Sequence, residues 1–138
     1  MHQSDWHRLV ACPPLVSIEA GLGLMRNILI VEDEPFIAFD LEEGLQQAGF
    51  NVIAISKTTT DALCAIERGG FDGVVLDALL QGNSAAPIAH ALRAKNVPFI
   101  VVSGYEMKEL DWLGDTRFVG KPFNISELVA VLKQMLSG

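Results

Sequence analysis

The 138-residue sequence has few basic residues, few cysteines and no long apolar run, and each shortage excludes a class of protein. Its 10 Lys and Arg against 17 Asp and Glu give a formal net charge of −7, whereas nucleic-acid binding needs clustered basic side chains. No apolar run approaches the roughly 20 residues that span a bilayer. The two cysteines, Cys12 and Cys64, lack metal-ligand spacing and are interpreted as free thiols of a reducing cytosol. We therefore expect a cytoplasmic protein that binds neither nucleic acid nor membrane.

What is abundant is apolar sequence, which makes up 50% of the chain and suffices for one buried core. Residues 1–24 differ from the rest, because Pro13-Pro14 and the glycines at 21 and 23 interrupt any continuous helix. We interpret 1–24 as an N-terminal extension, disordered or loosely packed, and 25–138 as a single domain. A functional arm that docks onto the domain through its apolar residues is the alternative.

Five short apolar runs are rich in β-branched residues and continuous rather than alternating. Such runs are typical of strands that are covered on both faces. The runs are Ile28–Val31, Val52–Ile55, Val74–Leu76, Phe99–Val102 and, more weakly, Arg117–Val119.

The segments between these runs carry helical spacing and helix-boundary signals. Gly49 predicts the end of the first helix, and Ser84 predicts an N-cap. Asn124 with Glu127 three residues later resembles a capping box, while Glu106–Leu113 is a short expected helix bounded by Gly104 and Gly114. Strands that alternate with helices indicate an α/β fold with a parallel sheet. The flavodoxin-like (βα)5 order 2-1-3-4-5 is the leading topology.

Charged and polar side chains follow four of the expected strands, at the point where each strand ends. They are Glu32, Asp33 and Glu34 after the first strand, Asp77 after the third, Ser103 after the fourth and Lys121 after the fifth. Because the carboxyl ends of parallel strands meet at one edge, we expect a single shallow pocket there. Neighbouring carboxylates repel without a cation, and oxygen ligands favour Mg²⁺. The set fits phosphoryl transfer onto an aspartate, although each group alone is also common in helix caps and surface turns.

Four segments together resemble the receiver domain of bacterial response regulators: ILIVEDEP (28–35), FDGVVLDALL (71–80), PFIVVSGY (98–105) and FVGKPF (118–123). The resemblance covers about residues 26–136. It implies that Asp77 is the phosphorylated aspartate. Glu32 and Asp33 match the acidic pair that holds Mg²⁺ or Mn²⁺, with Asp33 as the direct ligand, and the main-chain carbonyl of Leu79 matches the third protein ligand.

The resemblance also implies how phosphorylation is sensed. Ser103 matches the hydroxyl that binds a phosphoryl oxygen, Lys121 the lysine that pairs with another, and Phe118 the aromatic switch residue. Two departures stand out: residues 79–84 replace the usual Met-Pro-Gly turn, and the segment from Ser103 to Phe118 is short. With Pro98-Phe99 and Ser103-Gly104-Tyr105, these features resemble a stand-alone subgroup bearing Pro-Phe-x-x-x-Ser/Thr-Gly-Tyr, in which Tyr105 shares or replaces the role of Phe118.

The expected function is that of a single-domain response regulator in a two-component phosphorelay. A sensor histidine kinase or a histidine phosphotransfer protein would be its partner, and the protein would catalyse only its own phosphorylation and dephosphorylation. Because the sequence ends just after the last expected helix, output is expected through protein contact or onward transfer, from a monomer or weak homodimer. The alternative is a receiver-like binding module that works without phosphorylation. A phosphatase or a dinucleotide-dependent reductase fits poorly, since Leu79 and Glu32-Asp33-Glu34 stand where those enzymes need other residues.

Overall fold

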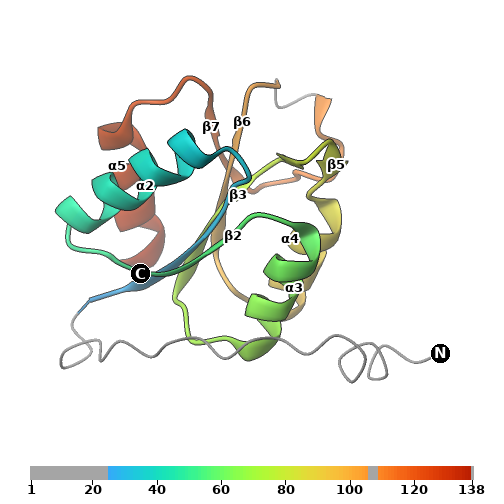
Figure 1. Cartoon of the computed structure of the whole chain (residues 1–138), viewed down its shortest axis with the longest axis horizontal. Helices are drawn as coiled ribbons and strands as arrows, with labels where there is room; N and C mark the ends of the chain where they lie inside the picture. The colour runs from blue at the N-terminus through green and yellow to red at the C-terminus, as the bar shows by residue number, and fades with distance from the viewer. Residues whose placement is uncertain (1–24, 106–108, 138) are drawn as a thin grey trace.

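The computed structural model describes residues 25–105 and 109–137, which form a five-stranded parallel sheet with helices on both faces (Figure 1). The predicted extension, residues 1–24, lies outside the described residues. The strands are β1 (Asn27–Val31), β2 (Asn51–Ser56), β3 (Gly73–Asp77), β4 (Leu79–Leu80), β5 (Asn83–Ser84), β6 (Phe99–Ser103) and β7 (Arg117–Gly120), and the helices are α2 (Pro35–Gln47), α3 (Thr59–Arg68), α4 (Ala86–Ala94) and α5 (Ile125–Leu136).

The strand order of the sheet is β2-β1-β3-β6-β7, which is the predicted 2-1-3-4-5 order. All four pairings are parallel. Each of the five predicted apolar runs lies within the strand that the structure assigns to it. Strands β3 and β6 are buried along their whole length, which explains why their apolar runs do not alternate.

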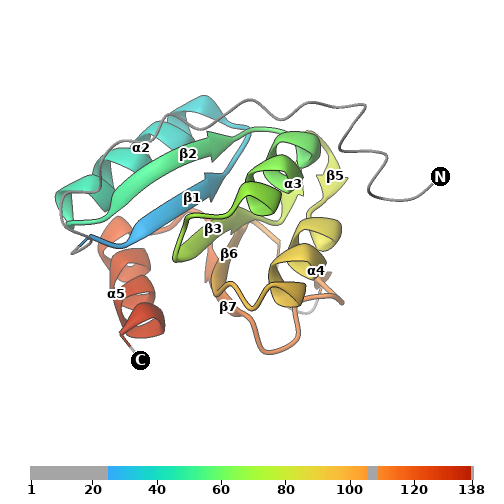
Figure 2. The same ribbon diagram turned by 90° about the horizontal axis from the view of Figure 1, so that it is seen from below.

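Two apolar clusters lie on the two faces of the sheet (Figure 2). Leu41 and Leu45 of α2 and Leu128 and Leu132 of α5 pack on one face. The other face carries α3 and α4, with Ile66, Ile88 and Leu92 among the buried residues. At about 1.5–3 kcal/mol for each large apolar side chain removed from water, these clusters are the main source of stability. They also hold the carboxyl ends of the strands in register.

The expected helix over Glu106–Leu113 lies partly outside the described residues; Glu109 has 3-10 geometry, and residues 110–113 form no helix. Leu110, Trp112 and Leu113 pack directly against the apolar cluster that α3 and α4 share. Arg93, at the end of α4, donates through Nη2 to the carbonyls of Trp112 (2.9 Å) and Leu113 (3.0 Å). It also donates to the hydroxyl of Thr116 at 2.8 Å. A side chain from α4 therefore binds this connection, and the described residues contain four α-helices.

The helix-boundary predictions are partly confirmed. Asn124 caps α5 by accepting from the N–H of Ser126, and Gly49 follows α2 with a φ of +96°. Ser84 is not the N-cap of α4, because Ala85 occupies that position and Ser84 ends the short strand β5. The Ser84 hydroxyl still accepts a hydrogen bond from the N–H of Ala86 at 3.1 Å. The cap function is therefore displaced by one residue rather than lost.

Two properties were expected from composition. Cys64 in α3 is 3% exposed and Cys12 lies outside the described residues, so the state of the two cysteines stays a prediction. Within the described part of the chain, none of the helices is both long and apolar enough to cross a membrane.

Candidate functional site

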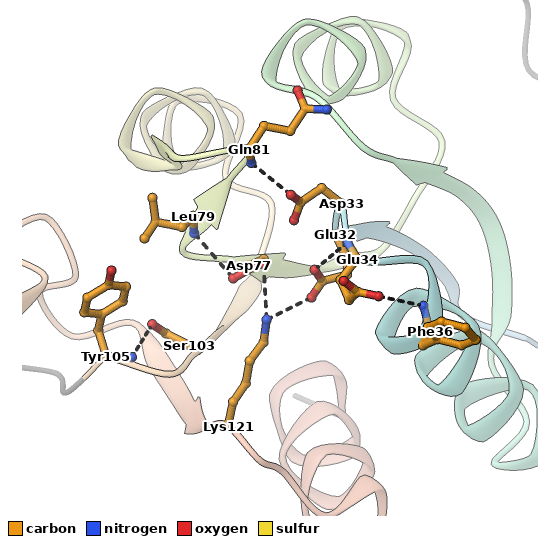
Figure 3. A network of polar contacts seen from close by, with 10 residues as sticks. All are labelled: Glu32, Asp33, Glu34, Phe36, Asp77, Leu79, Gln81, Ser103, Tyr105 and Lys121. Atoms are coloured by element: carbon orange, nitrogen blue, oxygen red, sulfur yellow. Dashed lines mark hydrogen bonds and ion pairs between the residues drawn. The ribbon is translucent and has the colours of Figure 1, made fainter.

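The carboxyl edge of the sheet brings the predicted site residues together. In the parallel register, Val31 of β1 lies beside Leu76 of β3, and Asp77 lies beside Val102 of β6. Ser103 in turn lies beside Gly120 of β7, which directly precedes Lys121. The groups predicted from four separate segments therefore meet at one place, as Figure 3 shows.

A single ammonium group joins two buried carboxylates at this edge. Nζ of Lys121 lies 3.2 Å from Oε1 of Glu32 and 3.2 Å from Oδ2 of Asp77 (Figure 3). Glu32 is 1% exposed and Asp77 is 6% exposed, so water screens these charges poorly. The second oxygen of Glu32 accepts from the N–H of Glu34 at 3.1 Å. The network therefore joins the carboxyl ends of three strands, β1, β3 and β7.

Burial and charge shift the protonation equilibria of this network. Burial, together with the neighbouring Asp77 carboxylate, raises the pKa of Glu32 to about 7, although the N–H of Glu34 and the charge of Lys121 act in the opposite direction. For Lys121, burial lowers the pKa, but the charges of Asp77 and Glu32 outweigh this effect and the net pKa is raised. The lysine therefore stays protonated, whereas Glu32 changes charge near neutral pH. The pocket is short of positive charge.

Asp33 lies at the same edge of the sheet but contacts the turn between β4 and β5. Its Oδ2 accepts from the main-chain N–H of Gln81 at 3.0 Å, from the turn between β4 and β5. The N–H of Leu79 donates to Oδ1 of Asp77 at 3.4 Å. These two contacts place the β4–β5 hairpin over the acidic groups (Figure 3). The sequence predicted an altered turn at residues 79–84, but it did not indicate that the N–H of Gln81 would bind Asp33.

The donor set fits a divalent cation. Glu32, Asp33 and Asp77 each offer an oxygen, and these oxygens all lie within 4.8 Å of one another. Three carboxylates against one ammonium leave an excess of negative charge that a small hard cation would neutralise. Glu32, Asp33 and Asp77 are thus suited to hold Mg²⁺, with the Leu79 carbonyl as the further ligand predicted from the sequence.

Ser103, Tyr105 and Phe118 lie on the β6 and β7 side of the pocket. Ser103 is 2% exposed, and its Oγ accepts from the N–H of Tyr105 at 2.9 Å, whereas it makes no hydrogen bond to Asp77. The Tyr105 side chain is 48% exposed. Phe118 is half-buried against the cluster beneath α3 and α4. In this structure the serine hydroxyl is therefore engaged with the backbone and not with the acidic groups.

Comparison with known proteins decides the family. The model of the response regulator receiver domain matches residues 28–133, most of the chain. The chain belongs to the response regulator receiver family. Receiver domains generally bind Mg²⁺ and contact histidine kinases and downstream proteins, and the acidic cluster described above is consistent with this.

Individual relatives place this receiver domain among signalling proteins. It is 36% identical over 118 residues to the sensory transduction protein RegX3 of Mycolicibacterium smegmatis, covering 81% of this chain and 51% of that protein. It is 31% identical over 123 residues to the phyllosphere-induced regulator PhyR of Methylorubrum extorquens, covering 86% and 46%. A crystal structure of a receiver protein from Sinorhizobium medicae matches with a TM-score of 0.74 and 30% identity, covering 83% of this chain and 97% of that one. The chain spans about half the length of the curated relatives it matches.

Proposed function

We propose that this receiver domain accepts a phosphoryl group on Asp77 from a phosphohistidine and passes on the signal by protein contact or by onward transfer. The observation that carries the proposal is the pair of 3.2 Å contacts from the Lys121 ammonium to Asp77 and Glu32. They place a buried carboxylate beside a fixed cation and two further acidic groups, at the carboxyl edge of a receiver fold. The partner would be a sensor histidine kinase or a histidine phosphotransfer protein.

The transfer is a displacement at phosphorus. An oxygen of the Asp77 carboxylate attacks the phosphorus, a P–O bond forms, and the P–N bond to the donor imidazole breaks, with the leaving nitrogen taking a proton from solvent. Mg²⁺ held by Glu32, Asp33 and Asp77 would supply charge neutralisation for the phosphoryl oxygens. The Lys121 ammonium supports the same step, because it already contacts Asp77 and can pair with a phosphoryl oxygen.

The proposed signal is a change in the partners of Ser103. Its hydroxyl, now bound by the N–H of Tyr105, would turn to a phosphoryl oxygen, and Tyr105 and Phe118 would adjust their packing in response. The domain would act only on itself, and its reaction would end in hydrolysis or transfer of the acyl phosphate. We place this exchange in the cytoplasm, with a monomer or weak dimer as the working form. The motif at 98–105 supports a stand-alone role.

Exposed aromatic side chains near the pocket offer a surface for the donor protein. Phe36 is 80% exposed and Phe39 57% exposed, one turn apart on α2 beside Glu34 (Figure 3 shows Phe36). Large exposed apolar side chains commonly mark contact surfaces. We expect Phe36→Ser with Phe39→Ser to slow transfer from a phosphorylated histidine kinase at least tenfold, while phosphorylation by acetyl phosphate stays unchanged. Equal slowing with both donors would instead show damage to the pocket.

Thermal melting with phosphoryl analogues tests the proposal. Melts of wild type, Asp77→Asn and Asp40→Asn are compared in chelator, in Mg²⁺, and in Mg²⁺ with beryllofluoride. Asp40 is an exposed aspartate of α2 and serves as the matched control. Ligand that binds only the folded state at a hundredfold excess over its dissociation constant stabilises it by about 3 kcal/mol, or several degrees.

The expected result is a rise with Mg²⁺ and a further rise with beryllofluoride in wild type and Asp40→Asn. In Asp77→Asn the second rise should be absent. If wild type shows no response to beryllofluoride, Asp77 is not a phosphoacceptor, and the binding module that works without phosphorylation becomes the better account.

A further inference from the structure

The β4–β5 hairpin reaches the acidic pocket through its backbone rather than through side chains. Leu79 pairs with Ser84 and Leu80 with Asn83, which leaves Gln81 and Gly82 as a two-residue turn. Both turn residues have positive φ, 51° at Gln81 and 81° at Gly82. This is the type I′ geometry that matches the twist of a hairpin. It fixes where the turn points.

The turn leaves the N–H of Gln81 free to bind Asp33. In a two-residue hairpin the pair that flanks the turn exchanges hydrogen bonds, so the N–H of the first turn residue has no partner within the ladder. That N–H belongs to Gln81, and it donates to Oδ2 of Asp33 at 3.0 Å (Figure 3). A carboxylate has about four acceptor positions, so this bond leaves capacity for a cation.

The same ladder orients Leu79. The second pair from the turn does not exchange hydrogen bonds, so the N–H and the carbonyl of Leu79 both face away from Ser84. The N–H is observed to donate to Asp77, 3.4 Å away, which places the Leu79 carbonyl on the same edge of the strand. Leu80 is 1% exposed and anchors the hairpin in the core.

We propose that the Gln81–Gly82 turn is a positioning element of the metal site, which holds Asp33 and the Leu79 backbone ready for a divalent cation. The inference rests on the proposed function only in taking Glu32, Asp33 and Asp77 as the cation site. It goes further by assigning part of the affinity for the cation to a turn that acts through its main chain and not through a side chain. A substitution that changes the backbone conformation of the turn therefore tests the proposal.

Two glycines allow a matched test. Gly82 and Gly49 both have positive φ, which disfavours a β-branched valine, and a Cβ built on either meets no atom within 4 Å. Gly49 follows α2 at the other end of that helix from Glu34. Binding of Mn²⁺ is measured from the electron paramagnetic resonance signal of the free ion, with competition by Mg²⁺, in wild type, Gly82→Val, Gly82→Asn and Gly49→Val. Melts in chelator accompany each titration.

We expect Gly82→Val to weaken Mn²⁺ and Mg²⁺ binding roughly tenfold, as for one lost hydrogen bond to a carboxylate. Gly49→Val should lose similar stability in chelator and bind as wild type does. Gly82→Asn should keep most of the affinity, because asparagine tolerates positive φ. Unchanged or tighter binding in Gly82→Val overturns the positioning role and leaves the proposed function standing. Absence of Mn²⁺ binding in wild type overturns both the cation site and this inference.

Discussion

Replacing Glu32 with glutamine should stabilise the metal-free protein at alkaline pH. Burial and the Asp77 charge raise the pKa of Glu32 from 4.5 to about 7, so the folded state holds this proton more tightly than the unfolded chain does. The folded state therefore loses stability as the pH rises through that window. At about 1.4 kcal/mol per pKa unit, the loss amounts to about 3 kcal/mol by pH 8. Glutamine carries no proton to lose and keeps the shape of the protonated side chain.

The assay is urea denaturation in chelator, at intervals from pH 4 to pH 8. Glu32→Gln should match wild type near pH 4, below the pKa of the unfolded chain, and exceed it by about 3 kcal/mol near pH 8. The raised pKa of Lys121 acts at more alkaline pH and leaves this window unaffected. Glu43→Gln, an exposed position on α2, controls for the loss of one negative charge. Mg²⁺ should reduce the advantage of Glu32→Gln, because the cation offsets the repulsion that the glutamine removes.

Two results would refute this reasoning. A difference between Glu32→Gln and wild type that stays constant from pH 5 to pH 8 would show that Glu32 does not titrate in this range. A variant less stable than wild type at pH 8 would show that the contact with Lys121 outweighs both burial and the charge of Asp77.

Three further variants test other parts of the structure. A Cβ at Gly44 would overlap Cγ1 of Ile125, so Gly44→Ala should cost about 1–3 kcal/mol in urea denaturation, and Ile125→Ala in the same chain should recover part of it. Arg93→Ala removes three hydrogen bonds and should cost about 1–2 kcal/mol, whereas Lys95→Ala, in an exposed ion pair at 3.8 Å, should cost less than about 0.5 kcal/mol. Asp33→Asn should melt higher than wild type in chelator and lose the rise with Mg²⁺; a lower melt with the rise retained would contradict the repulsion argument.

The sheet could be predicted from the sequence because its strands are buried on both faces. Continuous apolar runs such as Val74–Leu76 have few other stable arrangements, and parallel connection then limits the strand order. The convergence of Glu32, Asp77 and Lys121 followed from topology alone, since each comes at the end of a strand. Residue types and chain order carried this information.

The features that were missed depend on contacts between distant segments. In the described part of the segment Glu106–Leu113, the hydrogen bond from Arg93 and the direct packing of Trp112 hold residues 110–113 without a helix. Gln81-Gly82 is not one of the strong hairpin dipeptides, so neither the β4–β5 hairpin nor the bond to Asp33 could be anticipated. The raised pKa of Glu32 likewise arises from burial that only the folded chain creates.

The main-chain bond between the ends of β6 and β7 links two groups at the pocket mouth. The N–H of Lys121 donates to the carbonyl of Ser103 at 2.7 Å. A shift of the backbone at either strand end is therefore transmitted directly to the other. The side chains of Ser103 and Lys121 stay free to turn separately, so the ammonium can contact Asp77 while the hydroxyl still binds the N–H of Tyr105.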